Sequence, residues 1–479
     1  MLAAFEIGKR SLLTQQRGLD VTGNNIANVN TPGYTRQEAL LKSTDPFLNR
    51  GTLIGTGVMS DRIRAYREQF LDKEMRSTIA RNSGFEADEK LIQRIETALK
   101  EPSDNGIDSA MDSFFKAVEE LNSKPDDLAR RMNFTAQAQN LAQTFNGVGE
   151  ELSSLRAQTY QLVDANVQQM NRLLGDIAEM NKAIITVRSN NNDASATYLD
   201  KQSQMLEELS KFGDVQISRD ENGVADVTMN GTMVVSNINA STISLAQDVN
   251  GTTGEVTAKL TIKDRQGNVL GNYTPQTGEL ASSLKHFNTT LDDRDSSGGF
   301  SIWKHIDTLA DAFATKVNAL AQTGYGLSDT GATPPGRTIF TVPASGTVTA
   351  RSIAINPALI SDPSLVPTSS AANEPGNNDV LRAIGQLVND AAFVNGQTAR
   401  SYYALGLTKV ANLGADASNG KNVTKLTKDQ ILTQREAMTG VNIDEEAVNM
   451  IKFQRAFEAA ARVISTSSEM LQTIVNLGK

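Results

Sequence analysis

The sequence predicts a mainly helical chain with inserted β elements, arranged as an elongated rod of several domains. Three observations carry this prediction. Apolar residues recur at heptad spacing in the middle of the chain and at both ends, only 5% of the 479 residues are aromatic, and short alternating segments with Asn-Gly pairs interrupt the helical pattern. Long helices packed through small and aliphatic residues fit this composition better than an aromatic-rich globular core does.

The N-terminal segment predicts one amphipathic helix of about 28 residues. Its large apolar residues stand seven apart and form one narrow stripe, made of Phe5, Leu12, Leu19 and Ile26. Pro32 and Gly33 end the helix, because proline cannot continue it and glycine tolerates a sharp turn. From Tyr34 to about Ile63 the pattern is short and β-like, with glycines that mark turns.

A heptad pattern from Phe134 to Met180 is the strongest signal of the first half. It predicts one helix of about 70 Å. Polar residues at some heptad positions, among them Asn166 and Asp176, favour packing within a bundle of this chain over a simple dimeric zipper. A further helix is expected around residues 198–211.

Residues 213–280 predict small hairpins. Their polar and apolar residues alternate, and they contain Asn222-Gly223 and Asn230-Gly231, pairs that supply the positive φ of tight turns. A β element is therefore expected within the helical rod.

The second half predicts helices at residues 302–322, 377–392 and 424–438. Between the first two lies a Gly/Pro/Ser/Thr-rich stretch, residues 324–376, which is either an irregular loop or a small outlying module. Residues 414–422, GADASNGKN, resemble a phosphate-binding loop only faintly, so a flexible loop is expected there.

The last helix has the most regular pattern in the chain. It begins near Ile443 with Asn442 as its N-cap and with three acidic residues in its first turn. Its apolar stripe steps by three and four residues through Met450, Phe453, Phe457, Ala460, Ile464, Ser467, Leu471 and Ile474, and Ala456, Val463, Met470 and Leu477 flank it every seven. Such a stripe is too apolar to stay in water, so it needs a partner.

These elements divide the chain into three expected parts. The first is a terminal inner domain in which the two end helices form a coiled coil, and the second is an elongated helical bundle that contains the β-rich segment. The parts are residues 1–32 with 441–479, residues 33–325 with 377–440, and the irregular segment 326–376.

Composition excludes several classes of function. With no cysteine, and with only His286 and His305, nineteen residues apart, the chain offers no nucleophile or metal-ligand motif, so no catalytic residue, cofactor or metal is expected. A net charge of −9 argues against nucleic acid as a partner. The absence of a long apolar run argues against membrane insertion, and the N-terminus lacks a cleavable signal.

Two features of the sequence have a purely structural explanation as well as a functional one. The terminal heptads are equally consistent with the core of one globular bundle. The amides Asn24, Asn25 and Asn28 fit either turn chemistry at a helix end or hydrogen bonding between subunits where the chain leaves a tube.

Both ends of the chain resemble one family. The run SLLTQQRGLDVTGNNIANVNTPGYTRQ and the C-terminal GVNIDEEAVNMIKFQRAFEAAARVISTSSEMLQTIVNLG are similar to the paired signatures of bacterial flagellar rod, hook and hook-associated proteins. Interior stretches such as SAMDSFFKAVEELNSKPDDLARR resemble the members at the hook–filament junction. The likeness covers roughly residues 1–325 and 376–479. About fifty residues stand where such members often carry an outer β-domain, so residues 326–376 are expected to replace it.

This resemblance implies a secreted structural adaptor of the bacterial flagellum, exported by the type III route and needed for filament assembly. The implied partners are the hook protein, a second hook–filament junction protein, copies of the chain in a ring and a cytoplasmic export chaperone. The alternatives are another axial component, hook-like or the second junction protein, and a non-flagellar coiled-coil scaffold.

The resemblance also assigns site residues. Packing between subunits in the inner tube is expected for Phe5, Leu12, Leu19, Ile26, Asn24, Asn25, Asn28, Phe453, Phe457, Ile464, Leu471 and Ile474. The turn by which the chain leaves the inner domain is Thr31, Pro32, Gly33 and Tyr34. Candidate chaperone contacts are Met450, Phe453, Phe457, Ile464 and Leu471.

Overall fold

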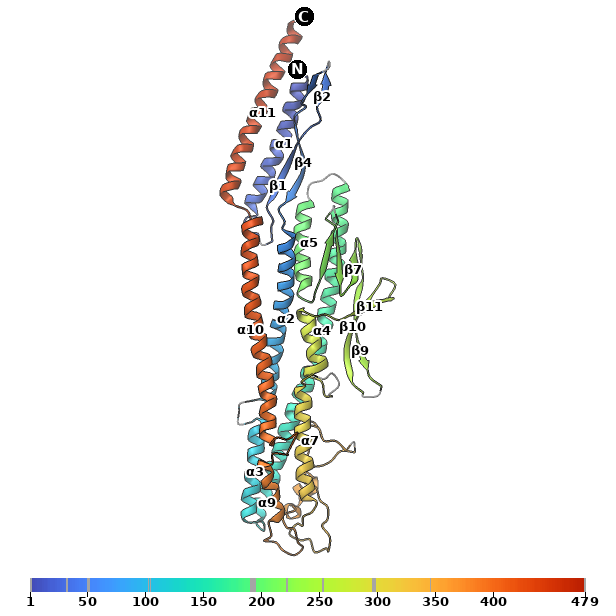
Figure 1. Cartoon of the computed structure of the whole chain (residues 1–479), viewed down its shortest axis with the longest axis vertical. Coiled ribbons are helices and arrows are strands. Elements are labelled where there is room, and N and C mark those ends of the chain that lie inside the picture. The colour runs from blue at the N-terminus through green and yellow to red at the C-terminus, as the bar shows by residue number, and fades with distance from the viewer. Residues whose placement is uncertain are drawn as a thin grey trace.

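The computed structural model is a long rod of helices that carries small sheets on one flank (Figure 1). It describes residues 2–31, 33–49, 52–101, 103, 105–189, 195–220, 223–251, 254–294, 299–344 and 346–477. Both ends of the chain lie at the same end of the rod (Figure 1). The predicted class, mainly helical with inserted β elements, is confirmed.

The terminal helices are α1 (Leu2–Ala27) and α11 (Ile443–Leu477), and they pack on each other. After α1 come strands β1 (Gln37–Ser43), β2 (Phe47–Asn49), β3 (Thr52–Ile54) and β4 (Val58–Ala65). β1 pairs antiparallel with β4, and β2 with β3, so the β-like pattern between Tyr34 and Ile63 forms one long hairpin beside α1.

The shaft of the rod consists of long helices. They are α2 (Gln69–Leu99), α3 (Ile107–Ser123), α4 (Leu128–Ser189), α7 (Ile302–Ala321) and α10 (Ala399–Thr439). The heptad pattern correctly predicts α4, but the helix is longer than that pattern. Its 62 residues span about 93 Å at 1.5 Å per residue.

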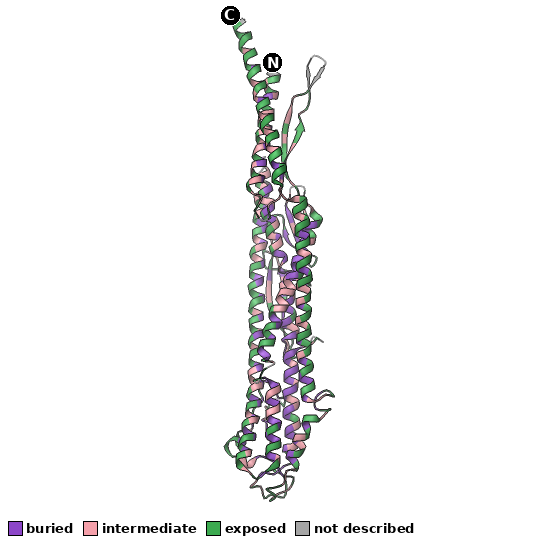
Figure 2. Ribbon diagram, turned by 90° about the vertical axis from the view of Figure 1, so that its left-hand side faces the viewer, coloured by how far each residue is buried: buried purple, intermediate pink, exposed green. Residues whose placement is uncertain are grey.

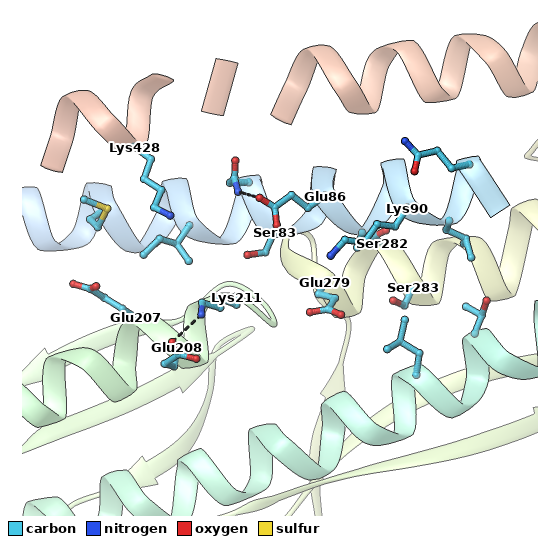
Figure 3. A pocket seen from close by; sticks show the side chains of 18 of the residues that line it. Ser83, Glu86, Lys90, Glu207, Glu208, Lys211, Glu279, Ser282, Ser283 and Lys428 are labelled. Carbon is cyan, nitrogen blue, oxygen red and sulfur yellow. Dashed lines mark hydrogen bonds and ion pairs between the residues drawn. The ribbon is translucent and has the colours of Figure 1, made fainter. Parts of the chain in front are cut away.

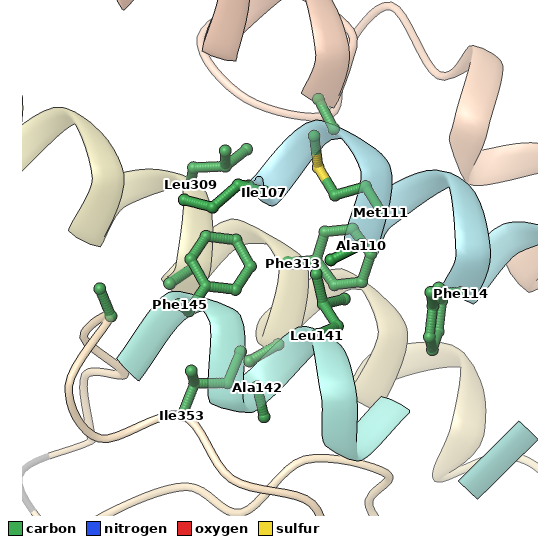
Figure 4. Packing of buried hydrophobic residues seen from close by; sticks show 14 of the residues in the cluster. Ile107, Ala110, Met111, Phe114, Leu141, Ala142, Phe145, Leu309, Phe313 and Ile353 are labelled. Carbon is green, nitrogen blue, oxygen red and sulfur yellow. The ribbon is translucent and has the colours of Figure 1, made fainter. Parts of the chain in front are cut away.

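A large apolar core fills the half of the rod away from the chain ends. α3, α4 and α7 enclose it, and Figure 4 shows Phe114, Phe145 and Phe313 pointing into it from these three helices. Phe114 and Phe313 meet edge to face with ring centroids 5.3 Å apart, an arrangement that aromatic quadrupoles favour. Burial is concentrated along the shaft, whereas the α1–α11 end is mostly exposed or half-buried (Figure 2).

A second apolar core joins α4 to the β elements. After α5 (Ser195–Ser210) the chain forms two antiparallel sheets. The first has four strands: β5 (Gln216–Arg219), β6 (Ala225–Met229), β7 (Thr232–Ser236) and β8 (Asn239–Ala240). The second has three strands: β9 (Thr242–Val249), β10 (Val256–Lys263) and β11 (Val269–Tyr273). Asn230 and Gly231 both have positive φ in the β6–β7 turn, as their pairing predicts. Asn222 lies outside the described residues.

After β11 the chain forms α6 (Gly278–Lys285) and a short π-helix (His286–Thr290), which the sequence pattern does not predict. Both histidines are buried in packing roles. His286 contacts Asp88 at 2.9 Å through Nε2, and the His305 ring stacks on Tyr402 with centroids 3.9 Å apart.

Residues 326–376 fold back onto the end of the shaft away from the chain ends. They contain α8 (Pro357–Ser361) and a 3-10 turn (Pro363–Leu365), and their buried residues join the α3–α4–α7 core. Arg131 of α4 is fully buried and donates to the carbonyl oxygens of Pro125 and Val366 at 2.7 and 2.6 Å. Burial lowers the pKa of this guanidinium to about 10.

The prediction of a flexible loop at residues 414–422 is wrong. Residues 399–439 form one unbroken helix, α10, and the stretch 414–422 lies inside it. The predicted helix at 377–392 is shorter, because α9 (Asp379–Gln386) ends in a 3-10 turn (Leu387–Asn389). Glycines made this region look flexible, but the structure uses them for close packing: a methyl group on Gly420 would lie 2.5 Å from the Phe85 ring.

The carboxyl group of Asp307 generates a prediction about pH. Asp307 is 7% exposed and accepts a 2.8 Å hydrogen bond from the Ala350 N–H, and burial raises its pKa to about 6. In the unfolded chain an aspartate titrates near 3.9, so the folded state holds this proton more tightly and stability falls as pH rises from about 4 to about 6.

We expect Asp307→Asn to stabilise the protein above that window, because it keeps an oxygen for Ala350 and removes the buried charge. The gain in the free energy of unfolding should be on the order of 3 kcal/mol near pH 8 and should vanish near pH 4. Unfolding followed at both pH values measures it. Asp311→Asn is the matched control, since Asp311 bonds the Val348 N–H at 2.8 Å from a more exposed position. An equal gain at both pH values contradicts the prediction.

Candidate assembly interface

Two glycines set how closely α1 and α11 approach. A methyl group on Gly18 would lie 2.6 Å from the Phe453 ring, and one on Gly8 would lie 2.7 Å from the Ile464 side chain. A larger residue at either position would have to displace the Phe453 or Ile464 side chain. As residue numbers rise along α1 they fall along α11, so the helices are antiparallel. The heptad pattern did not identify these glycines. A glycine inside a helix destabilises that helix by about 1 kcal/mol relative to alanine, so its presence in a strongly periodic helix indicates a role in packing.

The stripe predicted on α1 lies at the edge of this contact. Phe5, Leu12, Leu19 and Ile26 are all half-buried. The buried residues of the helix are instead mostly small or polar: Gly8, Thr14, Gly18, Val21, Thr22 and Asn25. The small side chains bring the backbones close, and the larger apolar residues border the seam.

The hairpin covers a second side of α1. Thr14 donates through Oγ1 to the Val58 carbonyl oxygen at 3.3 Å, and a methyl group on Gly57 would lie 3.4 Å from Ile7. α1 is therefore held between α11 and the β1–β4 pair, which explains why its small residues are the buried ones.

α11 is covered on one side only. Ala460 and Ser467 are buried in its seam, Met450, Phe453, Phe457, Ile464 and Leu471 are half-buried, and Ile474 is exposed. The other exposed large apolar residues of the helix are Ile443, Val448, Ile451, Val463, Met470 and Val475. Val463 and Met470 belong to the flanking heptad positions, so this face keeps a regular apolar row that one copy of the chain leaves uncovered.

Asn25 is the centre of a buried polar junction at the base of this helix pair. It is 1% exposed, and its side-chain amide makes four hydrogen bonds. Its Nδ2 donates to Gln37 O at 2.9 Å and to Glu446 Oε2 at 3.0 Å, and its Oδ1 accepts from Tyr34 Oη at 2.9 Å and from Gln37 N at 3.0 Å. These bonds use the full capacity of the amide, so Asn25 acts within the chain and joins α1, β1 and α11.

Charged groups extend the junction. Arg36 donates from Nε to Glu446 Oε1 at 2.8 Å and pairs with Glu445 at 3.1 Å, while its backbone N–H bonds Thr439 O at 3.0 Å. Burial, reinforced by the charges of Asp200 and Glu446, raises the pKa of Tyr34 well above its ordinary value. The Tyr34 hydroxyl therefore stays protonated and remains a donor to Asn25.

The other predicted polar residues have local roles. Asn28 donates to the backbone and side-chain oxygens of Asn24 at 2.9 and 2.8 Å, and its Oδ1 accepts from the Thr31 hydroxyl at 3.1 Å. Gly33 has a φ of +77° and packs against Gln204 of α5, so the exit turn requires glycine there. Pro32 lies outside the described residues.

Below the exit turn a cleft of about 700 Å³ separates α5 from the end of α10. Arg67 and Asp200 form an ion pair of 2.5 Å across it, and Arg435 pairs with Glu207 at 2.5 Å. Burial raises the pKa of Asp200 against the opposing charge of Arg67. These polar contacts therefore hold α5, the start of α2 and the end of α10 together beside the exit turn.

A larger cavity of about 1180 Å³ lies further along, between α2 and α10 on one side and α4, α5 and α6 on the other (Figure 3). Charges of both signs line it, including Glu86, Lys90 and Lys211. Ser282 Oγ and His286 Nε2 both contact the same oxygen of Asp88, at 2.5 and 2.9 Å. The carboxylate lies between the hydroxyl and the imidazole, which is not the order that activates a nucleophile.

Among the described residues, no cluster of three acidic or histidine side chains is placed to hold a metal ion. No described helix is apolar and long enough to cross a membrane.

Comparison with protein families gives three matches. A model described as the flagellar hook-associated protein FlgK helical domain matches residues 92–340, which is more than half of the chain. The ends match a flagellar basal body rod FlgEFG protein C-terminal model at residues 434–477 and a flagella basal body rod protein model at residues 5–35. The two terminal matches cover the helix pair described above.

Individual relatives are similar over nearly their whole length. The chain is 25% identical to the flagellar hook-associated protein 1 of Bacillus subtilis (strain 168), over 98% of this chain and 97% of that one. It is 25% identical to the Escherichia coli (strain K12) protein of the same description, over 96% and 97%. The solved flagellar hook junction protein FlgK of Burkholderia pseudomallei matches 57% of this chain and 47% of its own, with 21% identity and a TM-score of 0.49.

The Asn25 junction predicts the effect of a single substitution. Asn25→Ala leaves the buried N–H and C=O of Gln37 without partners, at a cost of about 1–3 kcal/mol for each unsatisfied group. We expect the free energy of local opening of α1 and α11, measured by native-state hydrogen exchange, to fall by about 2–4 kcal/mol, while the shaft stays protected.

Asn28→Ala is the matched control, because Asn28 bonds only its own turn at the surface, and it should change protection by no more than about 0.5 kcal/mol. Equal loss of protection in the two variants would show that the junction has no special role.

Proposed function

We propose that this chain, which belongs to the flagellar hook-associated protein FlgK family, joins the hook to the filament as one subunit of a ring. It is a structural component of the bacterial flagellum at the hook–filament junction, outside the cell, and not an enzyme. Its partners are axial proteins of the flagellum. The proposal concerns how it assembles and which axial proteins it meets.

The uncovered apolar row on α11 is the observation that carries the proposal. α1 covers one side of α11 with small residues, and Val463 and Met470, at the flanking heptad positions, stay 46% and 51% exposed. A stable monomer would not keep a regular heptad row in water. Contact with the terminal helices of neighbouring copies would cover the row, and copies repeated around an axis would form a tube.

The proposal also includes two specific partners. The hook protein would meet the ring on one side and a second hook–filament junction protein on the other, which the descriptions of the relatives as hook-associated support. Within the tube, the predicted residues Phe5, Leu12, Leu19 and Ile26 are half-buried, so they have surface left for a neighbour. Phe453, Phe457, Ile464 and Leu471 are half-buried likewise.

Substitution of the α1 stripe tests the inner-tube placement. Leu12→Asp combined with Leu19→Asp puts two charges at the half-buried edge of the α1–α11 contact, where desolvating them in a tube costs free energy. We expect a folded shaft but failure to incorporate at the junction and loss of filament growth in cells that depend on the variant, read by microscopy of isolated hooks and by motility.

Leu128→Asp is the control, because Leu128 is 52% exposed at the start of α4, away from the terminal helices, and should incorporate normally. Normal incorporation of the double variant would refute the inner-tube placement.

Before export the same helix needs protection, so an export chaperone is proposed to bind α11 by a helix-in-groove contact. The candidate residues Met450, Phe453, Phe457, Ile464 and Leu471 lie in the seam that α1 partly covers. The chaperone would therefore compete with α1 for this face.

Deletion of residues 442–479 should abolish chaperone capture in a pull-down, and Phe453→Asp in the full chain should weaken it at least about tenfold, since a buried aromatic anchor contributes more than about 1.4 kcal/mol. Val448→Asp is the matched control, because Val448 is 66% exposed and lies outside the seam. Capture that survives the deletion would exclude this helix as the chaperone site.

A further inference from the structure

An exposed apolar pair lies on the outer side of α10. Val423 and Leu426 are 63% and 71% exposed. Thr424 bonds Asn82 of α2 at 3.1 Å and is buried, and Leu426, two residues later, points about 200° away from it around the helix. Val423 and Leu426, here called the α10 patch, therefore face away from the rest of the rod.

A second apolar patch lies where the two sheets meet. A methyl group on Gly271 of β11 would lie 3.2 Å from the Thr232 hydroxyl of β7, and Arg265 donates to the Ile238 carbonyl oxygen at 3.2 Å. These contacts bring together four exposed apolar residues, which we call the sheet patch: Met233, Ile238, Val269 and Leu270.

The two patches are on opposite flanks of the rod and at the same level along it. Figure 1 shows α10 on one flank and β7, β10 and β11 on the other. A series of close contacts crosses the rod between them: Thr424 to Asn82, Gly84 to Gly278, Gly278 to Gly213, and Gly213 to Tyr273 of β11.

Subunits of a closed ring meet their neighbours through two different surfaces that face opposite ways at one level, because a head-to-tail contact is repeated until the ring closes. The α10 patch and the sheet patch have this relation. Each has only a few side chains, far below the roughly 1,200 Å² of total buried area of a stable two-protein interface. The contact is therefore too small to hold two free copies together.

We propose that the α10 patch of one copy docks on the sheet patch of the next copy in the ring. This inference rests on the proposed function, since it assumes that copies form a ring. It adds a contact between shafts to the contact between terminal helices. The occupant is a second copy, because the patches match in apolar character, level and opposite direction.

The absence of cysteine from the sequence allows a direct test. Leu426→Cys combined with Leu270→Cys places one thiol in each patch, and oxidation links neighbouring copies where the two Cα atoms come within about 7 Å. The variants are expressed in full, in cells whose hook–filament junctions depend on them, and isolated junctions are oxidised and run on a denaturing gel without reductant.

We expect the double variant to give a ladder of linked dimers, trimers and larger species, and each single variant to stay monomeric. Leu426→Cys with Val342→Cys is the matched control, because Val342 is 52% exposed but lies in the segment at the far end of the shaft, and it should give no ladder.

The results separate the two proposals. A double variant that is present in junctions but forms no ladder overturns the shaft contact alone. Linked dimers from Leu426→Cys alone also overturn it, because they would mean that two α10 patches face each other. A cysteine-free parent that is missing from the junctions overturns the ring itself.

Discussion

Contact between α1 and α11 is the constraint on which the remaining architecture depends. It joins residues separated by nearly the whole chain, and it depends on glycine at positions 8 and 18, where Ile464 and Phe453 respectively fill the space of a side chain. Because α1 and α11 pack on each other, the chain between them must leave this helix pair and return to it at the same end of the pair. The Asn25 amide, with Arg36 and Glu446, fixes that place, since it ties the end of α1, the start of β1 and the first turn of α11.

The shaft is held together differently along its length. Its far half has one continuous apolar core, whereas the half next to the inner domain is divided. There α2 and α10 share a small cluster of Met75, Ile79 and Ile431. Polar contacts such as Asp88 with Ser282 of α6 and Arg435 with Glu207 of α5 attach this pair to the helices on the other side of a cavity. Polar contacts contribute less net free energy than buried apolar area, so this half has the lower resistance to local opening.

Periodicity predicts α4 and α11 well because their apolar residues keep the heptad over many turns. It fails for most of α10, whose glycines at 406, 414 and 420 lower helix propensity yet pack against His305, Ile92 and Phe85. In α1, likewise, periodicity predicts the apolar stripe, which is half-buried, and misses the glycines that are buried in the contact with α11. Asn25 stands out in the sequence, but its partner Glu446 is 421 residues away, so no local pattern could reveal that the amide is satisfied within the chain.

Three of the uncovered apolar surfaces in this chain are the apolar row on α11, the α10 patch and the sheet patch. In the proposed assembly, this division of the apolar surface would matter for a subunit that is exported as a monomer and then holds a fixed place in the ring. The α10 patch and the sheet patch are each too small to drive stable association between free copies. Once one contact forms at the growing end, the others are held near their partners at high effective concentration, so several weak contacts become one strong attachment. The rigid shaft is what makes this coupling effective, because a long helix such as α4 transmits the position of one contact to the next.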